Sequence, residues 1–203
     1  MIRALLTDFG GVLVRTRTDA TRRALEARLG LPPGTIEDRV FGSDASLQAQ
    51  CGRMTVDEFW EHVRCDLRLD GRLSVAQFRA AFFAEDFLDE ELMALIRAAR
   101  PALKTGLISN AWSNARLLFR DDFAIADAFD IMVISAEEGV MKPEARIYQV
   151  ALDRLEVPAA QAVFVDDVPA NVRGAQVLGI TGIKFQTSEQ VQREIRRLLA
   201  RGA

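Results

Sequence analysis

The 203-residue sequence contains little histidine and little cysteine. Its one histidine is His62, and its two cysteines, Cys51 and Cys65, do not form a C-x-x-C pair. Too few ligands are therefore present for a structural zinc cluster or a disulfide framework, and we expect reduced thiols. A serine–histidine–aspartate triad is not expected either, because His62 lies in a helical stretch of another part of the chain, far from Ser109.

The sequence also lacks an excess of one charge and any long hydrophobic run. Its 26 basic and 29 acidic residues leave a formal charge of −3, which does not indicate a nucleic-acid-binding surface. The amino terminus lacks the basic, apolar and small-residue regions of a signal peptide, and no apolar run approaches the roughly 18 residues of a membrane-spanning helix. We therefore expect a cytoplasmic protein that binds a small molecule, with no nucleic-acid or membrane partner. Its oligomeric state is left open.

Hydrophobic residues make up 49% of the chain, enough for a substantial core. Short apolar runs, each typical of a parallel strand covered on both faces, alternate with helical patterns in the second half of the chain. Strands are predicted at residues 2–7, 103–108, 131–134, 162–165 and 181–185, with helices starting near residues 113, 144, 170 and 188. This alternation predicts an α/β fold with a doubly wound, mostly parallel sheet of Rossmann-like type.

The segment between the first two predicted strands has a different pattern. From residue 18 to about residue 100 it is helical with no strand expected, and Thr55-Val56-Asp57-Glu58 is a capping box at the start of one helix. Helices are predicted at 18–29, from 55, at 74–84 and at 89–99. We therefore expect an α/β core domain of residues 1–14 and 101–203, interrupted by a helical cap domain of residues 15–100. Such a cap selects a substrate and excludes water as it closes.

Four short segments carry polar residues at or near the ends of predicted strands. They are Asp8-Phe9-Gly10-Gly11, Ser109-Asn110, Lys142-Pro143 and Asp166-Asp167. In an open α/β sheet, ligands bind beyond the carboxyl ends of the strands. We therefore expect Asp8, Ser109 and the two adjacent aspartates to meet at one edge. Each segment alone is typical of a turn or a helix cap, but together and in this order they predict a functional site.

The residue types in these segments suit phosphoryl transfer. Asp8 is a candidate nucleophile, since a carboxylate can accept a phosphoryl group as a mixed anhydride. Two anions repel each other, so the attack needs cations: Lys142 supplies one, and a divalent ion held by Asp8 and the Asp166-Asp167 pair supplies another. Magnesium prefers a few carboxylate or carbonyl oxygens together with water and phosphate. Ser109 and the backbone amides after it add hydrogen-bond donors for the phosphate oxygens.

The sequence resembles the haloacid dehalogenase superfamily, which includes many magnesium-dependent phosphatases. The four segments match its motifs in order, over most of residues 2–15 and 103–186, and the helical stretch lies where this family places its type-1 cap. The strings DFGGVL from residue 8, MKPEARIY from residue 141 and VDDVPAN from residue 165 are similar to one subgroup. That subgroup contains sugar-1-phosphate phosphatases and the phosphatase domain of soluble epoxide hydrolase.

The resemblance implies a role for each residue of the site. Asp8 is the implied nucleophile, with Ser109 and Lys142 as phosphate-binding residues. Asp167 is the implied direct magnesium ligand together with Asp8, and Asp166 would hold a metal-bound water. The remaining expected groups are the Gly10 carbonyl on the metal, and Phe9, Gly10 and Asn110 beside the phosphate.

One position departs from the pattern of the superfamily. Most of its phosphatases have an aspartate two residues after the nucleophile as general acid and base, whereas this chain has Gly10. General acid–base catalysis contributes roughly 10² to 10⁴ in rate, about 3 to 5.5 kcal/mol. Superfamily members that resemble the sugar-1-phosphatases also have glycine here. Because an anomeric phosphate depends less on protonation of its leaving group, we expect a magnesium-dependent phosphatase of a small phosphorylated metabolite, with a sugar phosphate favoured.

Two other functions remain open from the sequence. A non-catalytic protein would bind a phosphate or metabolite with the same residues after losing the acid. A 2-haloacid dehalogenase uses an aspartate that attacks carbon and needs no acid at Gly10, but the Asp166-Asp167 pair would repel its carboxylate substrate unless a metal neutralised them. The sequence specifies neither the metabolite nor the group that replaces the missing acid, for which an acidic residue of the cap is one candidate.

Overall fold

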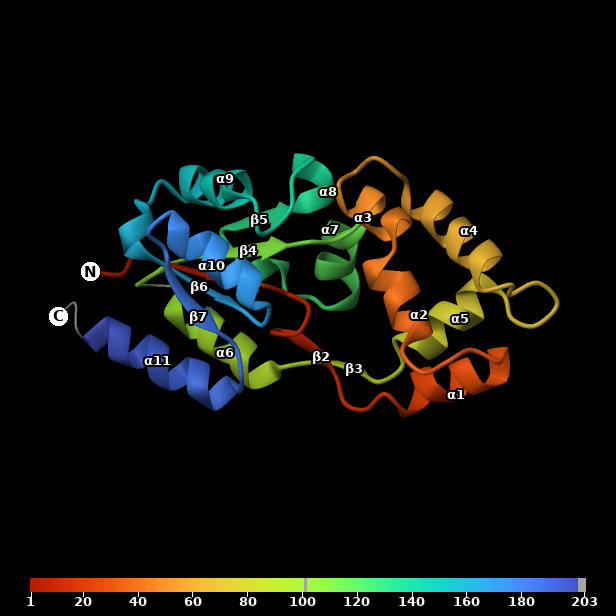
Figure 1. Cartoon of the computed structure of the whole chain (residues 1–203). Helices are drawn as coiled ribbons and strands as arrows, with labels where there is room; N and C mark the ends of the chain where they lie inside the picture. Colours follow the sequence, from red (N-terminus) through yellow and green to blue (C-terminus); the bar gives the residue numbers. More distant parts are fainter. Residues whose placement is uncertain (101, 201–203) are drawn as a thin grey trace.

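A five-stranded parallel sheet forms the centre of the protein, in a computed structural model that describes residues 1–100 and 102–200 (Figure 1). The neighbouring strands all pair in parallel, which confirms the predicted α/β class. The chain runs from β1 to strands on one side and later returns to the other side, and ligands bind at such a switch point. In spatial order the strands are β5 (Ile131–Ile134), β4 (Lys104–Ser109), β1 (Ala4–Thr7), β6 (Ala162–Asp166) and β7 (Thr181–Lys184).

Side chains alternate between the two faces of the sheet, and helices cover both faces. On one face, Leu5 of β1 lies in a cluster with residues of α6 (Glu90–Ala99) and α11 (Ser188–Ala200). On the other, Leu6 lies in a cluster with residues of α9 (Ala145–Leu155) and α10 (Pro169–Val177). All four residues of β1 are buried. Strands that are buried on both faces are continuous apolar runs in the sequence. This explains why the predicted strand bounds lie close to the observed ones.

A second group of helices gathers beside the carboxyl edge of the sheet (Figure 1). We call this group, residues 20–82, the cap, and its own hydrophobic cluster includes Phe59, Trp60 and Phe78. The predicted capping box starts one of its helices: the Thr55 hydroxyl accepts from the Glu58 amide at 3.2 Å, and Glu58 accepts from the Thr55 amide at 2.9 Å. The cap elements are α1 (Ala20–Leu29), α2 (Thr35–Glu37), η1 (Asp38–Gly42), α3 (Asp44–Gln50), α4 (Val56–Asp66) and α5 (Val75–Phe82).

A short two-stranded antiparallel sheet joins the cap to the main sheet. β2 (Val14–Thr16) pairs with β3 (Asp86–Leu88), so the two chain connections between the sheet and the cap run side by side. The expectation that no strand lies between residues 18 and 100 was wrong. A three-residue strand is too short to show an alternating pattern in the sequence, and its partner is distant along the chain.

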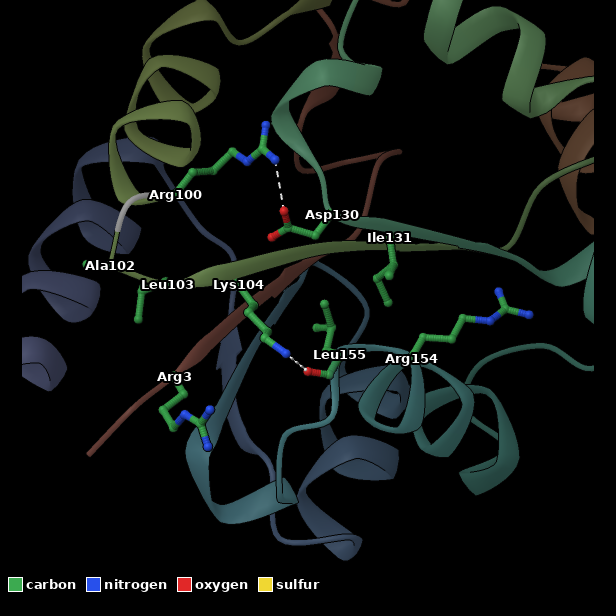
Figure 2. A pocket seen from close by; sticks show the side chains of 9 residues that line it. All are labelled: Arg3, Arg100, Ala102, Leu103, Lys104, Asp130, Ile131, Arg154 and Leu155. Carbon is green, nitrogen blue, oxygen red and sulfur yellow. Dashed lines mark hydrogen bonds and ion pairs between the residues drawn. The ribbon is translucent and has the colours of Figure 1, made fainter.

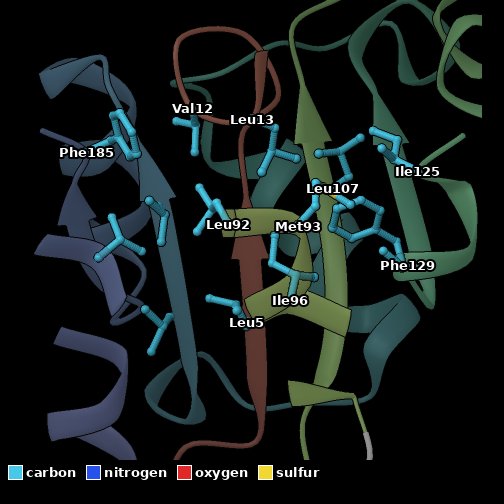
Figure 3. Packing of buried hydrophobic residues seen from close by; sticks show 14 of the residues in the cluster. Leu5, Val12, Leu13, Leu92, Met93, Ile96, Leu107, Ile125, Phe129 and Phe185 are labelled. Carbon is cyan, nitrogen blue, oxygen red and sulfur yellow. The ribbon is translucent and has the colours of Figure 1, made fainter. Parts of the chain in front are cut away.

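Helix α6 packs with the sheet and not with the cap. Its apolar residues Leu92, Met93 and Ile96 are fully buried in one cluster with Leu5 and Leu107 (Figure 3). The expected cap segment 15–100 therefore includes a helix that belongs to the core layer. Hydrophobic periodicity indicates a helix and its apolar face, but not the layer against which that face is buried. We propose that the boundary of the cap lies at β2 and β3.

The remaining elements are short connections. The helix predicted from residue 113 consists of α7 (Ala115–Leu117) followed by a π-helical turn, η2 (Leu118–Asp122). The others are η3 (Ala126–Ala128), α8 (Ser135–Glu138) and η4 (Ala159–Gln161). Among the described helices, none combines the length and the apolar character needed to cross a membrane.

Candidate active site

Asp8 lies directly beyond the end of β1, at the centre of the sheet. Its amide donates to the Val165 carbonyl of β6 at 2.8 Å, so the main-chain hydrogen bonding continues into the site. The Phe9 amide donates to Oδ1 of Asp8 at 2.7 Å, while the Phe9 ring packs on Phe119 with centroids 4.5 Å apart. Asp8 is 7% exposed and fixed in orientation, and Phe9 contributes to the site through its backbone.

Lys142 bridges Asp8 and the first residue of the aspartate pair. Its Nζ lies 2.7 Å from Oδ1 of Asp8 and 2.8 Å from Oδ2 of Asp166. The lysine side chain is 1% exposed, so its charge is removed from water and depends on these two carboxylates. The fold thus brings together three residues that lie far apart in the sequence.

Asn110 holds the backbone of Lys142 with both ends of its side-chain amide. Its Oδ1 accepts from the Lys142 amide at 2.8 Å, and its Nδ2 donates to the Lys142 carbonyl at 2.9 Å. We expected Asn110 among the groups beside the phosphate. Its side chain is instead used to fix the lysine loop, which leaves its backbone for that role.

Asp166 is fully buried and is held by groups that sequence reasoning did not identify. Its Oδ1 accepts from the Val168 amide at 2.8 Å, and both carboxylate oxygens accept from Nδ2 of Asn171 at 3.1 Å. The hydroxyl of Tyr148, the only tyrosine in the chain, donates to the Asn171 carbonyl at 2.8 Å. Together with Lys142 these donors satisfy a buried charge that would otherwise be very costly. The only sequence signal was the presence of Asn171 in the string VDDVPAN.

Ser109 and Gly10 lie at the same edge of the sheet. Ser109 is the last residue of β4 and is 3% exposed, and β4 pairs with β1, the strand that leads into Asp8. Gly10 is exposed, and a Cβ added there would meet no atom within 4 Å. A side chain would therefore have room at this position, so crowding does not explain the missing aspartate.

Three carboxylates converge beside Lys142. Asp8, Asp166 and Asp167 each place an oxygen within 4.8 Å of the others. One ammonium group against three carboxylates leaves two negative charges, which one divalent cation would balance. Gly11 makes room for this arrangement, because a Cβ there would lie 2.3 Å from Oδ2 of Asp167. Hard oxygen donors in this number and charge suit Mg²⁺, so the residues present fit the ion that the family implies.

Burial and mutual repulsion shift the pKa values of these carboxyl groups. Burial raises the pKa of Asp8 to about 7, with Lys142 opposing the rise and Asp166 adding to it. Burial, followed by the charge of Asp166, also raises the pKa of Asp167. A nearby cation would lower both pKa values, since it stabilises the charged forms. The electrostatics of the cluster therefore favour a bound cation.

A hollow of about 420 Å³ opens at the opposite edge of the sheet (Figure 2). Lys104 donates there to the Leu155 carbonyl, at the last residue of α9, and Arg100 pairs with Asp130 at 2.8 Å. Cations at the carbonyl end of a helix compensate its dipole, so the positive charge of this hollow has a structural explanation. We therefore place the candidate site at the three aspartates. The charged lining of the hollow is Arg3, Arg100, Lys104, Asp130 and Arg154.

Known proteins with similar sequences include phosphatases of similar length. A phosphatase from Mycobacterium tuberculosis is 30% identical over 204 residues, which cover 94% of this chain and 90% of that protein. A sesquiterpene phosphatase from Aspergillus oryzae is 25% identical over 198 residues, with 97% of this chain and 96% of that protein covered. Other relatives are longer: the chain spans 19% of mouse acyl-CoA dehydrogenase family member 10, at 29% identity over 97% of this chain.

Solved structures with the same fold include hydrolases of the HAD family. A HAD-like family hydrolase from Porphyromonas gingivalis superposes with a TM-score of 0.79 at 25% identity and covers 98% of both chains. A HAD family enzyme from Bacteroides thetaiotaomicron, in complex with magnesium and inorganic phosphate, has the same fold with a TM-score of 0.76 at 23% identity, over 92% of this chain and 95% of that chain. The family model of the haloacid dehalogenase-like hydrolases matches residues 2–179. This chain, with its aspartate cluster at the carboxyl edge of a parallel sheet, belongs to that family.

Proposed function

We propose that the protein is a magnesium-dependent phosphatase that hydrolyses a small phosphorylated metabolite through an aspartyl-phosphate on Asp8. The observation that carries this proposal is the contact of Asp8 with the buried Lys142. Asp8 is also one of three carboxylates, with Asp166 and Asp167, whose oxygens lie within 4.8 Å of one another. A carboxylate nucleophile, a fixed cation and hard oxygen ligands are the groups that this chemistry needs. Phosphatases that match nearly the whole chain support the same conclusion.

The residues that would hold the ion are Asp8, Asp167 and the carbonyl of Gly10, with Asp166 acting through a bound water. When bound, Mg²⁺ would neutralise charge on the phosphate and so allow the carboxylate to approach. Asp166 is already saturated by Lys142, Asn171 and the Val168 amide, which suits an indirect role better than direct coordination.

In the first step, an oxygen of Asp8 forms a bond to phosphorus as the bond to the leaving oxygen breaks. The Phe9 amide and Lys142 both donate to Oδ1 of Asp8, so they fix the direction of Oδ2, which we assign as the attacking atom. Lys142 and the Ser109 hydroxyl bind the phosphate oxygens. In the second step, water attacks phosphorus and the bond between phosphorus and the Asp8 oxygen breaks. Inorganic phosphate leaves with the oxygen of that water, its protons pass to the phosphate or to solvent, and the carboxylate is restored.

The proton balance at the leaving oxygen sets the substrate preference. Gly10 offers no carboxyl group, so the leaving oxygen departs as an anion that takes its proton from water. An anomeric oxygen tolerates this better than an ordinary alkyl oxygen, because the sugar ring stabilises its charge. We therefore favour a sugar phosphate whose phosphate is attached at the anomeric carbon.

The test is a phosphate-release screen with sugar phosphates, nucleotides and amino-acid phosphates, in Mg²⁺ and in excess chelator. We expect release in Mg²⁺ only, with anomeric phosphates ahead of alkyl phosphates, and none from Asp8→Asn. Full activity of that variant would rule out the covalent mechanism. Binding of inorganic phosphate with Mg²⁺, but no release from any substrate, would instead indicate a non-catalytic binding protein.

A further inference from the structure

Trp112 is attached to the sheet domain, but its ring packs into the cap. It follows Ser109 by three residues, in the loop between β4 and α7. Its ring centroid lies 4.8 Å from that of Phe59 and 5.5 Å from that of Trp60, both in α4. It also stacks on Phe41 of η1, with centroids 6.2 Å apart and planes 12° apart. The phosphate-binding loop that we assign to Ser109 is therefore attached to the cap by one large side chain.

A second contact joins the cap to the loop that carries Lys142. The sulfur of Cys51, at the end of α3, lies 3.5 Å from the sulfur of Met141, which directly precedes Lys142. At the next residue the backbones of the cap and of α8 are in close contact. A Cβ added at Gly52 would lie only 2.2 Å from the Ala136 carbonyl oxygen of α8. Figure 1 shows α3 beside α8 at this point.

The two contacts reach residues close in the chain to the two groups that we assign to the phosphate. Trp112 lies three residues after Ser109, and Met141 directly precedes Lys142. The side chain of Asn110 connects the two loops by its pair of hydrogen bonds to the Lys142 backbone. A displacement of the cap that withdrew the Trp112 ring would therefore act on Ser109, and through Asn110 on Lys142.

The Trp112 ring is held by packing. Its buried Nε1 has no hydrogen-bond partner within residues 1–100 and 102–200, while three aromatic rings surround it. Aromatic pairs in such geometries stabilise a packed cluster beyond the area that they bury. A phenyl ring would keep much of this packing without the indole N–H, so Phe is a conservative replacement here.

We propose that Trp112 is a positioning residue: by docking in the cap it holds the Ser109-Asn110 segment, and through Asn110 also Lys142, in register with Asp8. This inference rests on the proposed function for the identity of the phosphate groups. The coupling between the cap and the phosphate-binding loop can be tested separately, because the affinity for inorganic phosphate is measured without turnover.

The experiment compares Trp112→Leu with Trp112→Phe and with a matched control, Phe78→Leu. Phe78 is 0% exposed in the same cap cluster, and its ring neighbours are Trp60 and Phe82, both in the cap. Binding of inorganic phosphate is measured by calorimetry in Mg²⁺, and kcat and KM are measured with an aryl phosphate. Because a misplacement of about 1 Å costs on the order of 10²-fold in rate, we expect Trp112→Leu to lower kcat and weaken phosphate binding by about tenfold or more.

The control is expected to lower the melting temperature while changing phosphate affinity and kcat less than about twofold, and Trp112→Phe should restore most of both quantities. Equal values for Trp112→Leu and Phe78→Leu would overturn the positioning role, because any loss would then follow from a weaker cap. A Phe variant as impaired as the Leu variant would overturn the packing argument. If the wild type binds phosphate with Mg²⁺ but releases none from esters, the proposed function fails, while the affinity comparison still decides this inference.

Discussion

Gly11 faces the carboxylate of Asp167 so closely that an added Cβ would lie 2.3 Å from its Oδ2. The Gly11 backbone also has a φ of +75°, which favours glycine. The residue therefore permits Asp167 to join the other two aspartates. Its neighbour Gly10 has neither constraint, because a Cβ there meets nothing within 4 Å.

The first prediction uses this pair of adjacent glycines. Gly11→Ala should displace Asp167 and so weaken Mg²⁺ binding by about tenfold or more, since changes at or around metal ligands typically cost 10- to 100-fold in affinity. Gly10→Ala is the control and should leave the affinity nearly unchanged. Calorimetric titration with Mg²⁺ in the absence of substrate makes the comparison, and equal affinities of the two variants would contradict the assignment of Asp167 as a ligand.

The second prediction concerns the missing acid. Gly10→Asp introduces a carboxyl group at an exposed position with free space. If this carboxyl protonates the leaving oxygen, kcat/KM for alkyl phosphates should rise by about 10-fold or more, within the usual range of general acid catalysis. For aryl and anomeric phosphates the rise should be small, because their leaving oxygens need the proton less. A uniform effect on all substrates would refute this explanation.

The third prediction concerns the charge between the buried aspartates. Lys142→Met leaves Asp8 and Asp166 without their shared cation, and removing one partner of a buried ion pair typically costs about 3–5 kcal/mol. Turnover should be lost, and the free energy of unfolding in chelator should fall by about 3 kcal/mol. Lys104→Met is the control: its side chain is 42% exposed, so a loss below about 1 kcal/mol is expected. Similar losses in urea denaturation of the two variants would contradict this account of the Lys142 charge.

The fourth prediction concerns the connection between the β2–β3 pair and helices α6 and α11 of the core domain. Asp89, 6% exposed, lies 2.7 Å from Arg15 of β2, accepts from the Leu92 amide at 2.9 Å at the start of α6, and accepts from the Ser188 hydroxyl. Burial acts to raise the pKa of Asp89, but these donors outweigh it and hold the pKa below its ordinary value. Its charge therefore contributes stability above the unfolded-state pKa of about 3.9, which is lost as the pH falls through the lower folded-state pKa.

Asp89→Asn keeps an acceptor at the start of α6 but removes this charge. We expect the variant to be less stable than the wild type by about 1.5–3 kcal/mol at pH 7, the usual contribution of hydrogen bonds to a charged group. The difference should shrink as the pH falls below about 4, where the carboxyl of the unfolded chain takes up a proton, and vanish below the lower folded-state pKa, where the folded wild-type carboxyl is neutral too. Denaturant titrations at several pH values measure it, and a difference independent of pH would refute the charge argument.

The sheet, and the proximity of Asp8 to Asp166, were predictable because both follow from simple sequence patterns. Buried parallel strands are continuous apolar runs, and residues just beyond the carboxyl ends of such strands share one edge of the sheet. The layer of α6 was not predictable, since the same apolar stripe fits either the cap or the core. The choice depends on Leu92 and Met93 meeting Leu5 in three dimensions.

The hydrogen-bond partners of side chains inside the site could not be predicted from the sequence either. Asn110 lies in a predicted site segment and Asn171 only in the string VDDVPAN, yet their amides bind the Lys142 backbone and the Asp166 carboxylate. Asparagine both donates and accepts, and it is common in loops and helix starts. Its residue type therefore does not identify its partner, which is set by how two loops from different strands face each other.

The central position of β1 has a consequence for the order of folding during synthesis. β1 is made first but pairs with β4 on one side and β6 on the other, so its hydrogen bonds are complete only after residue 166 has left the ribosome. The cap cluster draws its buried residues from the continuous stretch between Leu25 and Phe82 and needs no such wait. Local contacts form faster than distant ones, so the cap can assemble while the nucleophile strand is still unpaired, and Asp8 becomes a buried residue only late in the emergence of the chain.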